Sequence, residues 1–446
     1  MNKRAQTHSV WLEEVRTLLL FAIIFIQLLT ASLVFLCDKH GVNAFPSSGW
    51  LPSFYVLLLI ISIACLAAYI VLLGQEVFGR PGTPVFKLLF IAVVLGSLSR
   101  VVMVSMLPIS SWDGLGLWTE WAARLIEWFN AIDPNEFHNR EHPRHPRFII
   151  FVHAVQGYLS QEYGIASLTW LNTSLVFLAV IFFACELAIL LAGLSEGILV
   201  AFLTMTVPLT ENHTLLVGYA ELWLSAGVLL TAVGISRFYI YKSAINYPLI
   251  CCGAILLIST KNIGLIYIGG FVLAFTLYAI LGKSSLRAHI AIGTAFSIMV
   301  FFRLLSGTES HFGDFVFFKI VDTPSPRSGH ATEVMELAVN NRRIFFENQS
   351  FYCLGLIGVL ACAVKTRTDD QVRGDMEFFL FGAVGFSISV FLGIQFFQEY
   401  SYIYARTTSD LGATRFLIPC MTLLLPLSLA RLSNVVRELG QLPAYR

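Results

Sequence analysis

A succession of apolar runs, each close to the length that crosses a lipid bilayer, is the feature that most constrains this chain. A hydrocarbon core of about 30 Å requires roughly 20 apolar residues per helix. Because lipid offers no hydrogen bonds to the backbone, each run is expected to be helical. The sequence therefore predicts an all-α integral membrane protein, a single polytopic bundle of about twelve transmembrane helices over residues 1–446. The twelve runs cover 17–37, 53–74, 88–108, 165–185, 188–208, 214–236, 247–259, 263–281, 288–306, 351–364, 377–397 and 412–431.

The composition excludes several other classes of protein. Hydrophobic residues make up 57% of the chain and charged residues only 13%, whereas soluble domains carry about 25% charged residues. A formal net charge of +1 excludes a nucleic-acid-binding protein that works by neutralising phosphates, since that needs a basic surplus. The eight cysteines include no C-x-x-C pair, so neither a disulfide framework nor a zinc site is predicted.

The run 148–160 decides the predicted topology. Counting it as a full span would make thirteen crossings and reverse every later loop. With twelve spans and a cytoplasmic N-terminus, the cytoplasmic segments are net positive and the opposite side is net negative, as the positive-inside rule requires. We therefore expect 148–160 to form a re-entrant or surface-lying helix on the outer face. The first run is too long for the core of a signal peptide.

Two long loops, 109–147 and 307–350, fall on the predicted outer side. Loops that are much longer than is needed to join two helices often carry functional residues. The first begins with SSWDGLGLWTEWAARLIEWF, whose tryptophans and leucines recur at helical spacing and predict an amphipathic helix on the outer leaflet. Its carboxylates include Asp113 and Glu120. Asp113 is either a residue that complements the N-terminus of this helix or a functional carboxylate.

The same loop continues with EFHNREHPRHPRF, where cationic groups are close together. Two His-Pro pairs disfavour helix at His142 and His145, which lie beside Arg144 and Arg147. Arginine matches phosphate oxygens with two parallel hydrogen bonds, and histidine can also donate to them. The cluster is therefore interpreted either as an anion site or as side chains that mark the membrane interface. A metal site is not predicted, because two histidines without a third ligand seldom suffice.

Further charged residues lie at the predicted outer ends of spans. Glu221 lies about one turn into its helix, where a carboxylate needs a partner or a water-filled cavity. Lys261 lies between two apolar runs and either extends to the interface or faces the same external cavity as Glu221. Arg415 precedes the last span on the outer side. Arg100 is placed deeper in the third span, and its partner cannot be read from the sequence.

Five stretches in order, WDGLGLWTEWAARLI, HPRHPRFIIF, GYAELWLS, STKNIGLI and TRFLIP, resemble motifs of bacterial membrane glycosyltransferases of the C superfamily. The likeness spans about 108–420. It implies a transferase-like core over 88–431 and leaves two N-terminal helices, 1–87, outside it. The chain departs from the relatives in its more basic His-Pro segment, in Glu221 where aspartate is commoner, and in Ile263 where an acid often stands.

The resemblance implies sugar transfer from a polyprenyl-phosphate donor to a hydroxyl of a lipid, glycan or protein, on the outer side of a bacterial inner membrane. Asp113 would be the general base, and a single displacement would invert the anomeric centre. Glu221 and Glu120 are further carboxylates of such a site. The donor phosphate would be held by Lys261, Arg415, Arg144, Arg147, His142 and His145.

No cofactor is fixed by the residues. Asp113 and Glu221 could share a divalent cation, Mg²⁺ or Mn²⁺, with the phosphate, and the sequence leaves this open. A second interpretation is a transporter or flippase of a lipid-linked or anionic solute. That function predicts charged residues at mid-membrane, a depth that only Arg100, Glu186 and Glu196 approach in the sequence.

Overall fold

The computed structural model describes residues 3–39, 49–80, 84–106, 148–164, 171–206, 220–241, 246–261, 263–280, 371–397 and 409–441. Within these ranges every regular element is an α-helix, so the predicted all-α class is confirmed for the part of the chain described. The helices are α1 (Lys3–Lys39), α2 (Trp50–Gly79), α3 (Pro84–Met106), α6 (Phe148–Tyr163), α7 (Leu171–Leu191), α8 (Leu194–Thr206), α10 (Glu221–Tyr241), α11 (Tyr247–Thr260), α12 (Gly264–Ile280), α18 (Gln371–Phe397) and α19 (Ser409–Gln441).

The predicted spans and the described helices largely coincide. Ten of the twelve predicted runs overlap a described helix; the other two, 288–306 and 351–364, lie outside the described residues. Six of these helices are long and apolar enough to cross a membrane: α1, α2, α3, α7, α10 and α19. Three more, α8, α11 and α12, are apolar but shorter. The chain is therefore a multi-spanning membrane protein by length and composition, and the number twelve stays a prediction.

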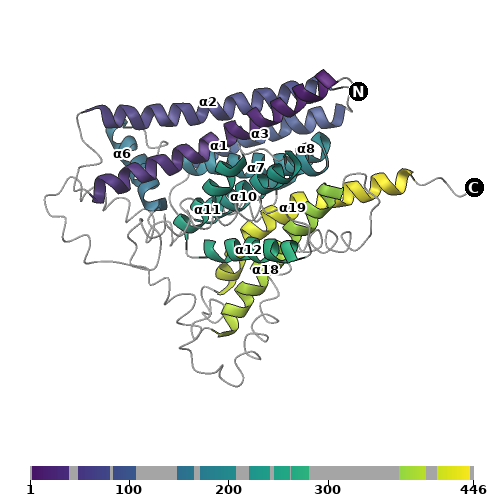
Figure 1. Ribbon diagram of the computed structural model, residues 1–446. Helices are drawn as coiled ribbons and strands as arrows, with labels where there is room; N and C mark the ends of the chain where they lie inside the picture. Colours follow the sequence, from purple (N-terminus) through teal and green to yellow (C-terminus); the bar gives the residue numbers. More distant parts are fainter. Residues whose placement is uncertain are drawn as a thin grey trace, which may run out of the picture.

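Burial separates the helices into central and peripheral ones. The spanning part of α7 is 100% buried and that of α10 is 89% buried, against 33% for α2 and 17% for α3. A helix that is apolar on all sides is expected either inside a bundle or against lipid. α7 packs against α8, α10 and α19, and α10 packs mainly against α11, so these helices form the middle of the bundle (Figure 1).

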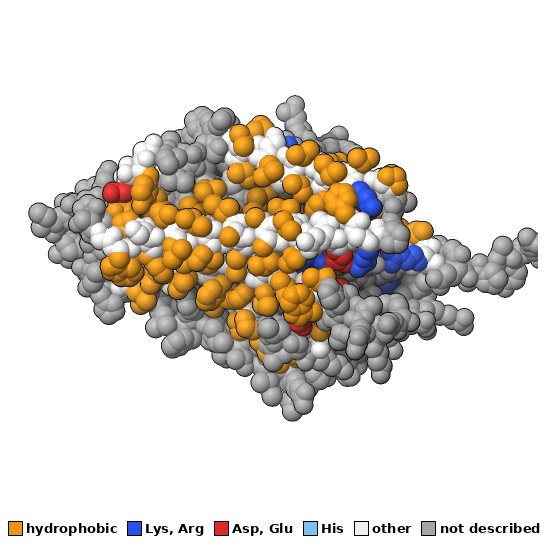
Figure 2. Space-filling view, turned by 90° about the horizontal axis from the view of Figure 1, so that it is seen from above, with side chains coloured by type: hydrophobic (Ala, Val, Ile, Leu, Met, Phe, Trp, Pro, Cys, Tyr) orange, Lys and Arg blue, Asp and Glu red, His pale blue; other side chains and the backbone are white. Residues whose placement is uncertain are grey.

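The peripheral helices present an apolar face to the surroundings. Leu57, Ile60 and Val71 of α2 and Leu88 and Leu95 of α3 are all at least half exposed. Hydrophobic side chains cover most of the described part of this face (Figure 2). Exposed apolar area of this extent is expected of a surface that contacts lipid.

The helix ends lie on two opposite sides of the molecule. The beginning of α1 and the end of α19 lie on the same side of the molecule (Figure 1), and ion pairs join the start of α1 to the ends of α2 and α7. We call this side the inner end, following the predicted orientation, and the opposite side the outer end. Arg237, near the inner end of α10, follows Glu221 at its outer end by 16 positions. This corresponds to about 24 Å of helix, most of the roughly 30 Å thickness of a bilayer core.

Helix α6 is the element for which the sequence left two possibilities. Eleven of its 16 residues are buried, including Phe148, His153 and Gln156, and it contacts α1, α2, α7 and α11. A helix lying on the protein surface would leave one face open to lipid or water. The burial therefore favours the re-entrant alternative, in which the helix enters the bundle.

Candidate functional site

The outer end of α10 and α11 carries a buried ion pair between two residues that the sequence singled out. Lys261 Nζ lies 3.0 Å from Glu221 Oε1. The carboxylate is almost fully enclosed, with 1% of its side chain exposed, whereas Lys261 keeps 17% exposed. Glu221 is also the first residue of α10, where a negative charge is stabilised by the helix dipole. Within the part of the chain that the structure describes, this pair is the candidate functional site.

A seam of small residues holds α10 and α11 together and so sets the position of this pair. A Cβ on Gly253 of α11 would lie 2.7 Å from the backbone nitrogen of Thr231 in α10. A Cβ on Gly227 would lie 2.9 Å from Leu257 Cγ, and one on Gly234 would lie 2.9 Å from the backbone nitrogen of Ile250. Small residues allow helix backbones to approach closely in membranes. The seam therefore fixes which residues of α10 and α11 face each other at the outer end.

A tight corner between α11 and α12 presents the lysine. Lys261 ends α11 with an extended backbone (φ −158°, ψ 149°), and its carbonyl accepts a hydrogen bond of 2.9 Å from Gly264 N at the start of α12. A Cβ on Gly264 would overlap the carbonyl group of Leu257. Only glycine fits at this close approach, and the corner that it allows directs Lys261 toward α10.

The start of α6 lies beside the same end of α10. The ring of Phe148 packs edge-on against Trp223 with their centroids 5.2 Å apart, and Trp223 is two residues after Glu221. Phe148 directly follows Arg147, the last residue of the His-Pro-Arg cluster. Helix α6 therefore begins beside the outer end of α10.

Farther along α6, His153 is buried in the bundle, with 2% of its surface exposed.

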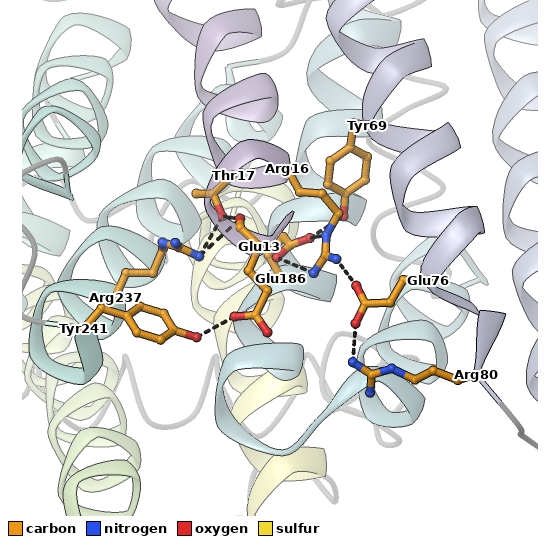
Figure 3. A network of polar contacts seen from close by, with 9 residues as sticks. All are labelled: Glu13, Arg16, Thr17, Tyr69, Glu76, Arg80, Glu186, Arg237 and Tyr241. Carbon is orange, nitrogen blue, oxygen red and sulfur yellow. Dashed lines mark hydrogen bonds and ion pairs between the residues drawn. The ribbon is translucent and has the colours of Figure 1, made fainter. Parts of the chain in front are cut away.

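A second cluster of charges lies at the inner end (Figure 3). Arg16 is fully buried; its Nε donates to Glu186 Oε1 at 2.8 Å, and the same guanidinium is paired with Glu76. Tyr69 donates to Glu186 Oε1 at 2.9 Å, and Arg80 is paired with Glu76. The charges alternate in sign along this chain of residues, so each buried carboxylate has a cationic partner.

The same cluster also joins α1 to α10. Arg237 Nη1 donates to Thr17 Oγ1 at 3.0 Å, and Tyr241 donates to the Glu13 carboxylate (Figure 3). At this end Glu196 is paired with Arg437, and Glu377 lies 3.2 Å from Arg431. Glu186 and Glu196, the two acids that the sequence places nearest to mid-membrane, are thus both ion-paired at the inner end. The sequence singles out these two acids but not Arg16, Glu76 or Arg237, each of which is only a charge near the end of an apolar run.

The other predicted site residues lie mostly outside the described residues. These are Asp113, Glu120, His142, Arg144, His145 and Arg147. Arg415 lies in the first two turns of α19, about 24 Å of helix from Arg431 at the inner end, which places its backbone toward the outer end. Arg100 is half buried in α3.

The described residues contain no group of three or more His, Cys, Asp or Glu side chains that could hold a metal ion. Comparisons of the chain with family models, curated proteins and solved structures find no match.

Proposed function

We propose that this protein is a membrane glycosyltransferase that moves a sugar from a polyprenyl-phosphate donor to an acceptor hydroxyl at the outer face of the membrane. The observation that carries the proposal is the ion pair of Lys261 with the buried Glu221 at the outer end. It supports the proposal because it fixes a partly exposed cation where the phosphate of a lipid-linked donor would lie.

The geometry leaves the lysine free to bind an anion while it remains paired. An ammonium group has three N–H donors, and the 3.0 Å contact with Glu221 uses one of them. The buried carboxylate holds Lys261 in one orientation, so a donor phosphate would not have to order it. The cationic segment that ends at Arg147 would supply further ligands beside Trp223, and Arg415 would do so from α19.

The proposed reaction is a single displacement at the anomeric carbon. The acceptor oxygen attacks this carbon, the bond from the carbon to the phosphate oxygen breaks, and the polyprenyl phosphate leaves with the electron pair. The acceptor proton passes to the Asp113 carboxylate as general base. Lys261 stabilises the charge that develops on the leaving phosphate. One displacement inverts the anomeric centre.

Transfer of a radiolabelled sugar from a polyprenyl-phosphate donor to membrane acceptors tests the proposal, with the purified full chain in proteoliposomes. We expect labelled acceptor to form. If the labelled donor crosses the vesicle membrane and no acceptor is labelled, the enzyme proposal is overturned in favour of the transporter interpretation.

Substitution of Asp113→Asn tests the general base in the same assay. Asparagine keeps the shape and caps a helix about as well, so a merely structural Asp113 would tolerate the change. Loss of a general base should lower turnover about a hundred- to ten-thousandfold, with donor binding nearly intact. A folded variant that binds donor and turns over within a few-fold of wild type would refute the role of Asp113. Glu120 and Glu221 would then be the carboxylates to substitute next.

A further inference from the structure

The inner end of α2 and α3 carries a second cationic feature that the proposed reaction does not use. Arg80 follows the last residue of α2, and 53% of its side chain is exposed. Lys87, in the first turns of α3, donates to the carbonyl oxygen of Phe78 at 3.4 Å and lies 5.9 Å from the centre of the Phe78 ring. Only Gly79 lies between Phe78 and Arg80 along the chain, so both cations lie at the same end of α2.

The acidic neighbour of these cations is turned inward. Glu76 is only 10% exposed and is shared between Arg80 and the fully buried Arg16. Arg16 in turn is paired with the buried Glu186. The carboxylates of Glu76 and Glu186 therefore lie inside, whereas the Arg80 side chain lies outside.

The cations adjoin the apolar face that contacts lipid. Phe78 is 47% exposed, Val85 58% and Leu88 65%, and charged side chains gather at the right-hand end of the apolar face in Figure 2. A ligand that fits both features has acyl chains against the apolar strip and an anionic headgroup at its end. Basic residues between membrane helices at the headgroup level are a known way to hold such lipids.

We propose that Arg80 and Lys87 form a binding site for an anionic phospholipid at the inner end of α2 and α3. The phosphate of the headgroup accepts hydrogen bonds from the guanidinium and the ammonium, and the acyl chains lie along Phe78, Val85 and Leu88. The proposal is independent of the sugar-transfer reaction, which concerns the opposite end of the bundle.

The test is the thermal unfolding of the full chain in detergent, with phosphatidylglycerol or phosphatidylcholine added at equal concentration. A lipid that binds the folded state raises the melting temperature. We expect phosphatidylglycerol to raise it by several degrees and phosphatidylcholine to raise it less. In the double variant Arg80→Gln, Lys87→Gln the apparent affinity for phosphatidylglycerol should fall about ten- to thirtyfold, because two headgroup contacts are lost. The charge-conserving variant Arg80→Lys, Lys87→Arg should retain most of the effect.

Three results would overturn the proposal. The first is an unchanged phosphatidylglycerol effect in the double glutamine variant. The second is an equal effect of the two lipids on the wild-type chain, which decides the matter even if the variant does not fold. The third is an equal effect of inorganic phosphate, which would show that the acyl chains contribute nothing.

Discussion

At the scale of the residue, Lys261 is the most sensitive group of the candidate site. Lys261→Met keeps the length of the side chain and removes its charge. A charge-assisted hydrogen bond contributes roughly 1.5–3 kcal/mol, so donor use should weaken about ten- to a hundredfold. Steady-state transfer kinetics at varied donor concentration measure this. Arg437→Met is the control, because it removes a half-exposed cation at the inner end, where donor is not expected; it should leave transfer unchanged. Wild-type kinetics in Lys261→Met would reduce this residue to one that merely reaches the interface.

Single residues also show what the sequence could and could not reveal. Glu221 and Lys261 were recognisable as candidate site residues because each is a charged residue beside a long apolar run. A charged group at such a position needs a partner or a water-filled cavity. The sequence predicted at most that Lys261 faces the same cavity as Glu221. Their pairing depends on which faces of α10 and α11 meet, and this is set by the close approaches of Gly227 and Gly253. The partnership of Arg16 with Glu186 links residues 170 apart in the chain. No local pattern encodes such a contact, because it arises only when α1 packs on α7.

At the scale of the element, the corner between α11 and α12 has a sharp test in Gly264. In Gly264→Ala the new Cβ would overlap the Leu257 carbonyl, so the corner must shift and carry Lys261 away from Glu221. We expect a loss of about 1–3 kcal/mol of stability, typical of overpacking, together with weaker donor use. Gly269→Ala is the control in the same helix, since a Cβ at Gly269 meets nothing within 4 Å. Thermal unfolding and donor kinetics of both variants provide the measurement. Similar behaviour of the two would show that the corner does not position the lysine.

The second prediction at the scale of the element concerns the ion pairs that attach α1 to the bundle. Arg16→Met leaves Glu186 buried without its cation, which should cost about 3–5 kcal/mol. Adding Glu186→Gln should recover much of that loss, because the amide is neutral and its oxygen can still accept from Tyr69. Arg80→Gln serves as the exposed counterpart and should cost at most about 1 kcal/mol. Thermal unfolding of the wild-type chain and of these three variants measures the losses of stability. If Arg16→Met and Arg80→Gln cost the same, the buried pair contributes no more than a surface one.

At the scale of the whole molecule, apolar runs predicted the elements well because lipid imposes one length and one kind of backbone hydrogen bonding on each span. Ten runs overlap described helices, and the boundaries differ most at α1, which begins at Lys3 rather than at 17. The placement of 148–160 was harder, since 16 residues are too few to cross a bilayer at 1.5 Å each, and only its packed surroundings favour a re-entrant course. The separation of 1–87 from the rest rests on resemblance alone, whereas α1 contacts α6, α7 and α11 directly.

The orientation of the bundle is the prediction on which both proposed sites depend. The ion pairs group the start of α1 with the ends of α2, α7 and α19, and the charge bias of the loops predicts that this end is cytoplasmic. Cysteines introduced as Asn139→Cys and Ser328→Cys, in the two long loops, should react with a membrane-impermeant thiol reagent on intact cells. Val436→Cys, at an exposed position of α19 near the inner end, should react only after the membrane is permeabilised, and the unmodified chain gives the background of the native cysteines. Labelling of Val436→Cys in intact cells, with none at the two loop positions, would place Lys261 on the cytoplasmic side. The sugar donor would then have to be presented there, and the phospholipid site at Arg80 and Lys87 would face the outer leaflet instead.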